Sequence, residues 1–126
     1  MQKGKYAEFR LLEGGKLGIK TYKTKDICDY AFEMQTRAYK LGCATKIIKR
    51  IDDYSILMEA GNTKIIEEKL KDGVYYDDIF VALRKKVKNI MLNNPYKKAR
   101  AKHCKYDFTN KNLAMYNGKI VLIDFV

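Results

Sequence analysis

The strongest local constraint on the fold is an Asn-Gly dipeptide at positions 117–118. Strand-like runs flank it, at 113–116 before the dipeptide and at 119–125 after it. Asn-Gly suits a two-residue hairpin turn, because both turn residues must adopt positive φ angles. Since the two ends of such a hairpin emerge on the same side, we expect Asn112 and Asp124 to lie together at its open end.

Two further antiparallel hairpins are predicted earlier in the chain. At 6–23, strand-like alternation surrounds the turn signal Glu13-Gly14-Gly15. At 45–59, two strand-like runs flank Asp52-Asp53. These connections are too short for parallel crossovers, so the strands are expected to pair antiparallel.

Three helices are predicted between the hairpins. The first begins near Thr24 or Asp26, both N-cap candidates, and ends at Gly42. A short helix is expected at 64–71, and a longer one at 77–92 ends before an Asn-Asn-Pro sequence. The apolar residues of the first helix recur at steps of three and four: Ile27, Ala31, Met34, Ala38 and Leu41.

The predicted order of elements is hairpin, helix, hairpin, helix, helix, hairpin. This order favours an α+β fold with antiparallel strands packed with helices. A chain of 126 residues is long enough for one domain with a core and too short for two. Hydrophobic residues make up 47% of it, which argues against a disordered chain.

The charge balance favours acidic partners. The formal net charge is +11, from 26 Lys and Arg against 15 Asp and Glu. Six basic residues, counting His103, lie within 96–105. Nucleic acid, nucleotide phosphates or an acidic protein surface are the candidate partners, and a solvated basic surface without a specific partner is the alternative.

A reduced, intracellular compartment is the expected location, most simply the cytoplasm. No apolar run approaches the roughly 20 residues of a membrane span, and the first ten residues lack the apolar centre of a signal peptide. Cys28, Cys43 and Cys104 are odd in number and have no C-x-x-C spacing, so we expect neither a disulfide framework nor a zinc site.

Three oxygen-bearing side chains near the C-terminal hairpin indicate phosphoryl-transfer chemistry. Asp107 and Asn112 have the D-x-x-x-x-N spacing, and Asp124 follows after the hairpin. A carboxylate can accept a proton from a hydroxyl, and oxygen ligands suit Mg²⁺. The spacing alone is common and is also typical of loop and cap structure. The combination with a hairpin of this length is more specific.

Together with the order of elements, this segment resembles the catalytic loop and the D-F-G segment of the protein kinase fold. The resemblance covers nearly the whole chain. It implies one reduced kinase-like domain over 1–126, with an N-lobe-like part at 1–60 and a catalytic-loop region at 61–126. The helical substrate lobe of a kinase has no counterpart in this sequence, and one strand of the N-lobe is expected to be missing.

The resemblance also implies roles for single residues in binding ATP. Lys20 would contact the nucleotide phosphates, and Glu33 would form an ion pair with it. Met58 would occupy the gatekeeper position. Backbone groups near Glu59 and Gly61 would meet the edge of the adenine.

Further roles follow for the catalytic loop. Asp107 would orient the attacking hydroxyl and accept its proton, while Asn112 and Asp124 would hold Mg²⁺. Two of the assignments have competitors in the sequence: Lys16 and Lys23 for Lys20, and Asp29 for Glu33.

The sequence also departs from the kinase pattern. Lys105 stands where the histidine of H-R-D is expected, with His103 two residues earlier. Gly14-Gly15 and Gly18 do not form a G-x-G-x-x-G loop, and Val126 replaces the glycine of D-F-G.

Two functions are compatible with these residues. The first is an ATP- and Mg²⁺-dependent phosphotransferase acting on a hydroxyl, most simply of a protein Ser or Thr. The alternative is a catalytically degenerate kinase-like protein whose basic surface captures or inhibits an acidic partner. Nucleic-acid binding has only the charge in its favour, because the sequence offers no spaced aromatic platform for bases.

Overall fold

The computed structural model describes residues 2–3, 7–98, 112–123 and 125. The chain forms an α+β fold with antiparallel sheets, as the order of elements predicted. The larger sheet has five strands in the spatial order β1-β2-β3-β5-β4. Its strands are β1 (Gln2–Lys3), β2 (Ala7–Leu11), β3 (Leu17–Tyr22), β4 (Ile47–Arg50) and β5 (Ser55–Glu59).

The first hairpin forms at its glycine turn. Gly14 and Gly15 have φ angles of 88° and 72°, values that favour glycine, and they connect β2 to β3. The sheet also has the short strand β1, which pairs with β2 and which the sequence did not predict. A two-residue strand leaves too short a pattern to be recognised by alternation.

Helix α1 (Lys25–Lys40) follows β3 directly. Thr24 caps it, because the Thr24 hydroxyl accepts a hydrogen bond of 3.3 Å from the Ile27 N–H. Beyond its last turn Gly42 has a φ of 73°, as expected for a helix that ends at glycine. The predicted boundaries of this helix are therefore confirmed.

Helices α2 (Lys64–Lys71) and α3 (Asp77–Leu92) have the predicted bounds. The second, two-stranded sheet consists of β6 (Leu113–Tyr116) and β7 (Lys119–Leu122). Asn117 and Gly118 form its turn with φ angles of 49° and 79°, which confirms the hairpin. Strand β7 ends three residues before the predicted end.

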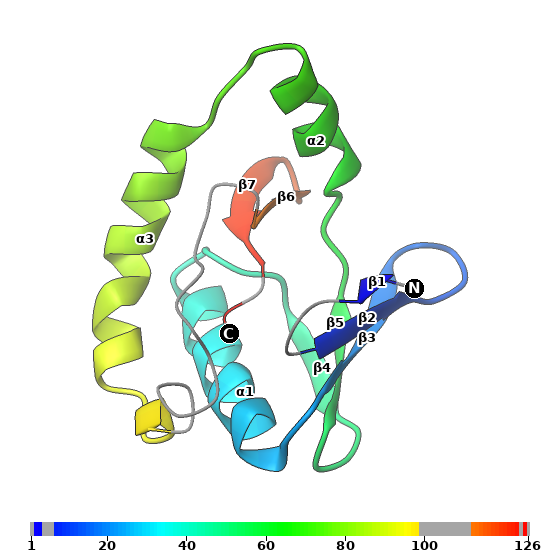
Figure 1. Cartoon of the computed structure of the whole chain (residues 1–126), viewed down its shortest axis with the longest axis vertical. Helices are drawn as coiled ribbons and strands as arrows, with labels where there is room; N and C mark the ends of the chain where they lie inside the picture. Colours follow the sequence, from blue (N-terminus) through cyan, green and yellow to red (C-terminus); the bar gives the residue numbers. More distant parts are fainter. Residues whose placement is uncertain (1, 4–6, 99–111, 124, 126) are drawn as a thin grey trace.

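Helix α1 lies between the larger sheet and α3, and α3 runs along one side of the molecule (Figure 1). The small sheet connects the remaining elements, since β6 contacts α2 and β7 contacts α3. One continuous core joins both sheets to the helices. Burial of each large apolar side chain contributes about 1.5–3 kcal/mol. Fully buried members include Tyr30, Met34, Ile56, Val87, Leu113 and Leu122.

Candidate functional site

Lys20 projects from the face of the large sheet that carries the core. Side chains alternate along a strand, so Gly18, Lys20 and Tyr22 share one face of β3. Tyr22 is buried, and the Lys20 Nζ atom lies 5.6 Å from the centre of its ring. Across the sheet Lys20 is paired with Phe9 on one side and with Ile56, which is fully buried, on the other. Lys20 is therefore a half-buried cation with apolar neighbours on both adjacent strands.

The two competing lysines have different surroundings. Lys16 precedes β3 and Lys23 follows it, and both are exposed. Among these three lysines, Lys20 is the one whose position on the strand directs it toward the core face.

Glu33 lies on the side of α1 and pairs within its own helix. Its Oε2 atom accepts a hydrogen bond of 2.9 Å from Nε of Arg37, one turn later. About one third of the Glu33 side chain is exposed. In this structure Glu33 pairs with Arg37, and the Lys20–Glu33 pair stays a prediction.

Met58, the expected gatekeeper, is buried on β5 and faces α1. Gln35 of α1 lies beside it, with Nε2 at 3.6 Å from the Met58 sulfur. The same amide donates hydrogen bonds of 3.0 Å to the carbonyl and to the hydroxyl of Thr45. Gln35 is a buried polar link between helix and sheet that the apolar pattern of the helix did not indicate.

The segment after β5 is held by hydrogen bonds on both of its flanks. The Glu59 N–H donates to the Lys46 carbonyl, and the Ala60 N–H donates to the Lys16 carbonyl, both at 2.9 Å. The Glu59 carboxylate accepts a hydrogen bond from the hydroxyl of Tyr116 on β6. The Glu59 side chain is thus directed to the hairpin, and the N–H groups of Glu59 and Ala60 are both bonded within the protein.

Gly61 lets this segment pass close to β6. A Cβ atom at Gly61 would lie 2.6 Å from the Cβ of Ala114, a distance that real Cβ atoms do not tolerate. The next residue, Asn62, exchanges two backbone hydrogen bonds with Met115, of 2.8 and 2.9 Å. The linker between β5 and α2 is therefore fixed to the small sheet.

The open end of the small hairpin carries Asn112. The Ile123 N–H donates a hydrogen bond of 2.9 Å to the Asn112 carbonyl, so these two residues face each other across the hairpin. The Leu122 N–H donates to the Cys43 carbonyl at 2.8 Å, which fastens β7 to the loop after α1. Phe125 is buried in the core, with 4% of its surface exposed.

Asp107 and Asp124 lie outside the described residues. Their predicted roles, and the predicted meeting of Asp107, Asn112 and Asp124, therefore stay predictions. Within the described ranges no group of three or more His, Cys, Asp or Glu residues could hold a metal ion.

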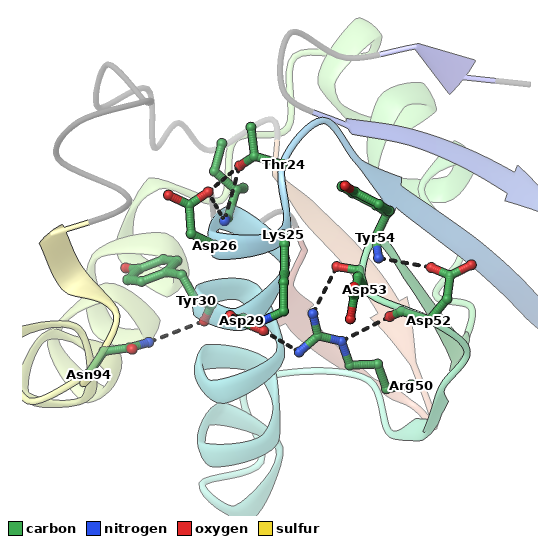
Figure 2. Close-up of polar contacts among 11 residues, drawn as sticks. Thr24, Lys25, Asp26, Asp29, Tyr30, Arg50, Asp52, Asp53, Tyr54 and Asn94 are labelled. Atoms are coloured by element: carbon green, nitrogen blue, oxygen red, sulfur yellow. Dashed lines mark hydrogen bonds and ion pairs between the residues drawn. The ribbon is translucent and has the colours of Figure 1, made fainter.

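A second polar cluster joins α1 to the turn between β4 and β5 (Figure 2). Arg50 donates to the Asp29 carboxylate and to the carbonyls of Asp52 and Asp53, the last two at 3.1 and 2.9 Å. Lys25 donates to the other oxygen of Asp29 at 3.1 Å. Asp29 is the alternative to Glu33 for the predicted ion pair with Lys20. In the structure it joins the start of α1 to the turn between β4 and β5.

The charge of Asp29 is stabilised despite partial burial. Burial raises the pKa of the carboxyl group, but the hydrogen bonds from Arg50 and Lys25 outweigh it and hold the pKa below its ordinary value. Cys28 precedes Asp29 in the sequence. Burial raises the pKa of its thiol to about 11, and the charge of Arg50 lowers that pKa by a smaller amount. Cys28 and Cys43 are both buried and free, and Cys104 lies outside the described residues.

Asn94 connects the end of α3 to α1, as Figure 2 also shows. Its side-chain amide donates to the Tyr30 carbonyl at 3.1 Å, and its Oδ1 atom accepts from the Tyr96 N–H at 2.8 Å. Asn94 is 1% exposed. The sequence identified this residue as part of a helix stop and missed its contact with a residue 64 positions away.

Comparisons of the chain with protein-family models, with curated proteins and with solved structures found no match. In the described parts of the chain, no helix combines the length and the apolar character needed to cross a membrane.

Proposed function

We propose that this chain is a small kinase-like protein that binds ATP with Mg²⁺ and transfers a phosphoryl group to a hydroxyl, most simply of a protein Ser or Thr. The observation that carries the proposal is the attachment of the C-terminal hairpin. It is joined to the linker after β5 by the Asn62–Met115 bridge and to the loop after α1 by the Leu122–Cys43 hydrogen bond.

This attachment supports the kinase-like assignment of the nucleotide site, at both its adenine end and its phosphate end. The linker would provide backbone groups near Gly61 for the adenine, since the Glu59 N–H is already bonded to the Lys46 carbonyl, while Lys20 on the core face of β3 would meet the phosphates. The order sheet, helix, strand pair, linker, two helices and hairpin is the order expected for the kinase fold up to the D-F-G segment.

The donor set at the open end of the hairpin fits a hard cation. Asn112 offers a side-chain oxygen, its carbonyl is paired with Ile123, and Asp124 follows Ile123 in the sequence. Amide and carboxylate oxygens are suitable Mg²⁺ ligands. When bound, Mg²⁺ would neutralise and orient the phosphates. The buried Phe125 supports this assignment, because it would anchor the segment that contains Asp124.

In this proposal the protein acts mainly by positioning and by neutralising charge. Lys20 would hold the phosphate oxygens. Asp107 would orient the hydroxyl of the substrate and accept its proton.

A thermal-shift titration tests the nucleotide part of the proposal. Ligand binding to the folded state raises its stability, by about 2.7 kcal/mol at a ligand concentration of 100 times Kd. We expect ATP with MgCl₂ to raise the melting temperature, and ATP with EDTA to raise it less. An unchanged melting temperature at 10 mM ATP and 10 mM MgCl₂ would reject nucleotide binding.

The ion pair of Glu33 favours the alternative function, a degenerate kinase-like binding protein. Active protein kinases need a Lys–Glu ion pair between strand and helix, whereas Glu33 pairs with Arg37 in this structure. Under this alternative the basic surface would capture an acidic protein. A wild-type protein that binds no Mg²⁺–ATP but retains an acidic partner in a pull-down would support it.

A further inference from the structure

A cavity of about 500 Å³ lies between the end of α1 and the turn of the small hairpin. Its walls come from both elements, with Tyr39, Lys40 and Gly42 on one side and Tyr116 and Lys119 on the other. The cavity is open to solvent, so a ligand in it would stay partly exposed. None of these five residues has a role in the nucleotide site proposed above.

Two ammonium groups from separate elements line the cavity. Lys40 is the last residue of α1 and Lys119 is the first of β7, and both are exposed. The Lys119 Nζ atom lies directly over Gly42. A Cβ atom added at Gly42 would be only 2.8 Å from this nitrogen. A glycine at this position therefore leaves the room that the ammonium group occupies.

A third cation, Lys86, lies near the loop after α1 but does not line the cavity. Lys86 of α3 and Lys119 both lower the pKa of the buried Cys43 thiol, against the larger effect of burial, which raises it. Both charges therefore act on Cys43, whose neighbours Gly42 and Ala44 line the cavity.

Two negative groups face these cations. Carbonyls at the end of α1 carry partial negative charge, but those of Ala38 and Tyr39 already accept hydrogen bonds from Cys43 and Gly42. The Glu59 carboxylate is bound by the Tyr116 hydroxyl. The charged side chains that line the cavity itself, Lys40 and Lys119, are both cationic.

Aromatic rings form the other part of the lining. Tyr39 is 40% exposed, so its ring is accessible to a ligand. Tyr116 is 8% exposed and its hydroxyl is already bonded, so it presents ring rather than hydroxyl. Flat rings stack on tyrosine with a moderate gain in affinity, and phosphate monoesters pair well with lysine ammonium groups.

From this combination we propose that the cavity binds a small phosphorylated ring compound, with its phosphate between Lys40 and Lys119 and its ring against Tyr39. This is a second ligand site, which adjoins the one assigned to ATP through the Tyr116–Glu59 hydrogen bond. It stands whether or not the chain transfers phosphate.

Phenyl phosphate is the simplest probe, because it contains one ring and one phosphate. Isothermal titration calorimetry of the wild-type chain with phenyl phosphate should give saturable binding. Lys119→Gln should weaken it about tenfold or more, the effect of losing one charge-assisted contact. Lys69→Gln on α2 is the matched control, since it removes the same charge from an exposed lysine of another element.

Two further variants separate the ring contact and the nucleotide site. Tyr39→Leu should weaken phenyl phosphate several-fold and leave inorganic phosphate unchanged. Lys20→Met should leave phenyl phosphate binding unchanged, so failure of the ATP proposal and failure of this one can be told apart. Circular dichroism establishes that each variant is folded.

Three results would overturn the proposal. They are no saturable binding by the wild type up to 10 mM phenyl phosphate, equal weakening by Lys69→Gln and Lys119→Gln, and loss of binding in Lys20→Met. The second would indicate non-specific attraction by the basic surface, and the third would assign the probe to the nucleotide site.

Discussion

At the residue scale, strand alternation predicts the direction of a side chain more sharply than helix periodicity does. Alternation fixes the face of β3 from which Lys20 projects, because each strand position has one of two faces. A position on the flank of a helix has several possible partners. Glu33 therefore has Arg37 within reach on its own helix, which the sequence analysis did not consider.

The first prediction at this scale concerns Lys20. Lys20→Met keeps the apolar stem and removes the charge, so the fold should be retained while affinity for Mg²⁺–ATP falls about tenfold or more, as for loss of a charge-assisted contact. Calorimetry of Mg²⁺–ATP binding measures this. Lys16→Met is the matched control, since Lys16 is exposed outside β3. Equal losses in both variants would remove Lys20 from the phosphate site.

The second prediction concerns the hydroxyl of Tyr116. Burial, and then the hydrogen bond to Glu59, raise the Tyr116 pKa to about 12. Because the folded-state pKa is above that of the unfolded chain, this stabilisation is complete below about pH 10 and is lost as the pH rises toward 12. Tyr116→Phe should lower the free energy of unfolding by about 1 kcal/mol at pH 7.

Urea denaturation of the wild type and Tyr116→Phe between pH 7 and 11.5 tests this prediction. The difference in unfolding free energy between the two proteins should shrink above pH 10. A difference that stays constant to pH 11.5 would contradict the assigned cause.

At the element scale, polar contacts fix how α1 sits against its neighbours. Arg50 and Asp29 join its start to the β4–β5 turn, Gln35 joins its middle to Thr45, and Asn94 joins it to the end of α3. Such contacts determine the orientation of a helix whose apolar face alone would tolerate some sliding.

The third prediction concerns the Asp29–Arg50 pair. Asp29→Asn should lower the free energy of unfolding by about 1–3 kcal/mol at pH 7, because Arg50 loses its charged partner in a partly buried setting. The Asp29 pKa is lowered, so its stabilisation is present above the ordinary carboxyl range and is lost as the pH falls through and below about 4. The variant and the wild type should therefore converge in acid.

Glu33→Gln provides the control for this measurement. It breaks a half-exposed pair within one helix, which is worth about 0.5 kcal/mol. Equal destabilisation by the two substitutions would show that Asp29 does not hold α1 to the sheet.

The fourth prediction concerns the approach of the linker to the small sheet. Gly61→Ala should lower the unfolding free energy by about 1–3 kcal/mol, because the added methyl group meets the Cβ of Ala114 at 2.6 Å. The double variant Gly61→Ala with Ala114→Gly removes the clash. Thermal denaturation should show a higher melting temperature for the double variant than for Gly61→Ala alone, and a further decrease would show that the two positions do not meet.

The sequence predicted elements well and contacts between them poorly, for a physical reason. Caps, turns and periodicity are local, and they gave α1, α2, α3 and the Asn117-Gly118 hairpin with nearly correct bounds. Gln35 and Asn94 act through partners on other elements, and a single sequence contains no sign of such pairs. The face of Lys20 was predictable, whereas the partner of Glu33 and the contact of Tyr116 with Glu59 were not.

At the scale of the whole molecule, the large sheet and the small hairpin form two walls joined by the linker after β5. Asn62 and Met115 connect the walls at one end, and Leu122 connects the hairpin to the loop after α1. Lys20 belongs to the first wall and Asn112 to the second. In the proposed function, a nucleotide that contacts both Lys20 and Asn112 would be sensitive to changes in either wall.

The last prediction separates catalysis from binding. Asp107 and Asp124 lie outside the described residues, and the proposed function gives them different tasks: Asp107 would contact the substrate hydroxyl and Asp124 would hold Mg²⁺. Asp107→Ala should therefore reduce transfer of radiolabelled γ-phosphate by about 10²–10⁴-fold while Mg²⁺–ATP binding is retained. Asp124→Asn removes a full charge from the proposed metal ligands and should abolish Mg²⁺-dependent binding as well as transfer. Equal labelling by the wild type and Asp107→Ala would exclude Asp107 as the catalytic base, and a wild type that binds Mg²⁺–ATP but labels no protein in a lysate would identify a nucleotide-binding protein without transferase activity.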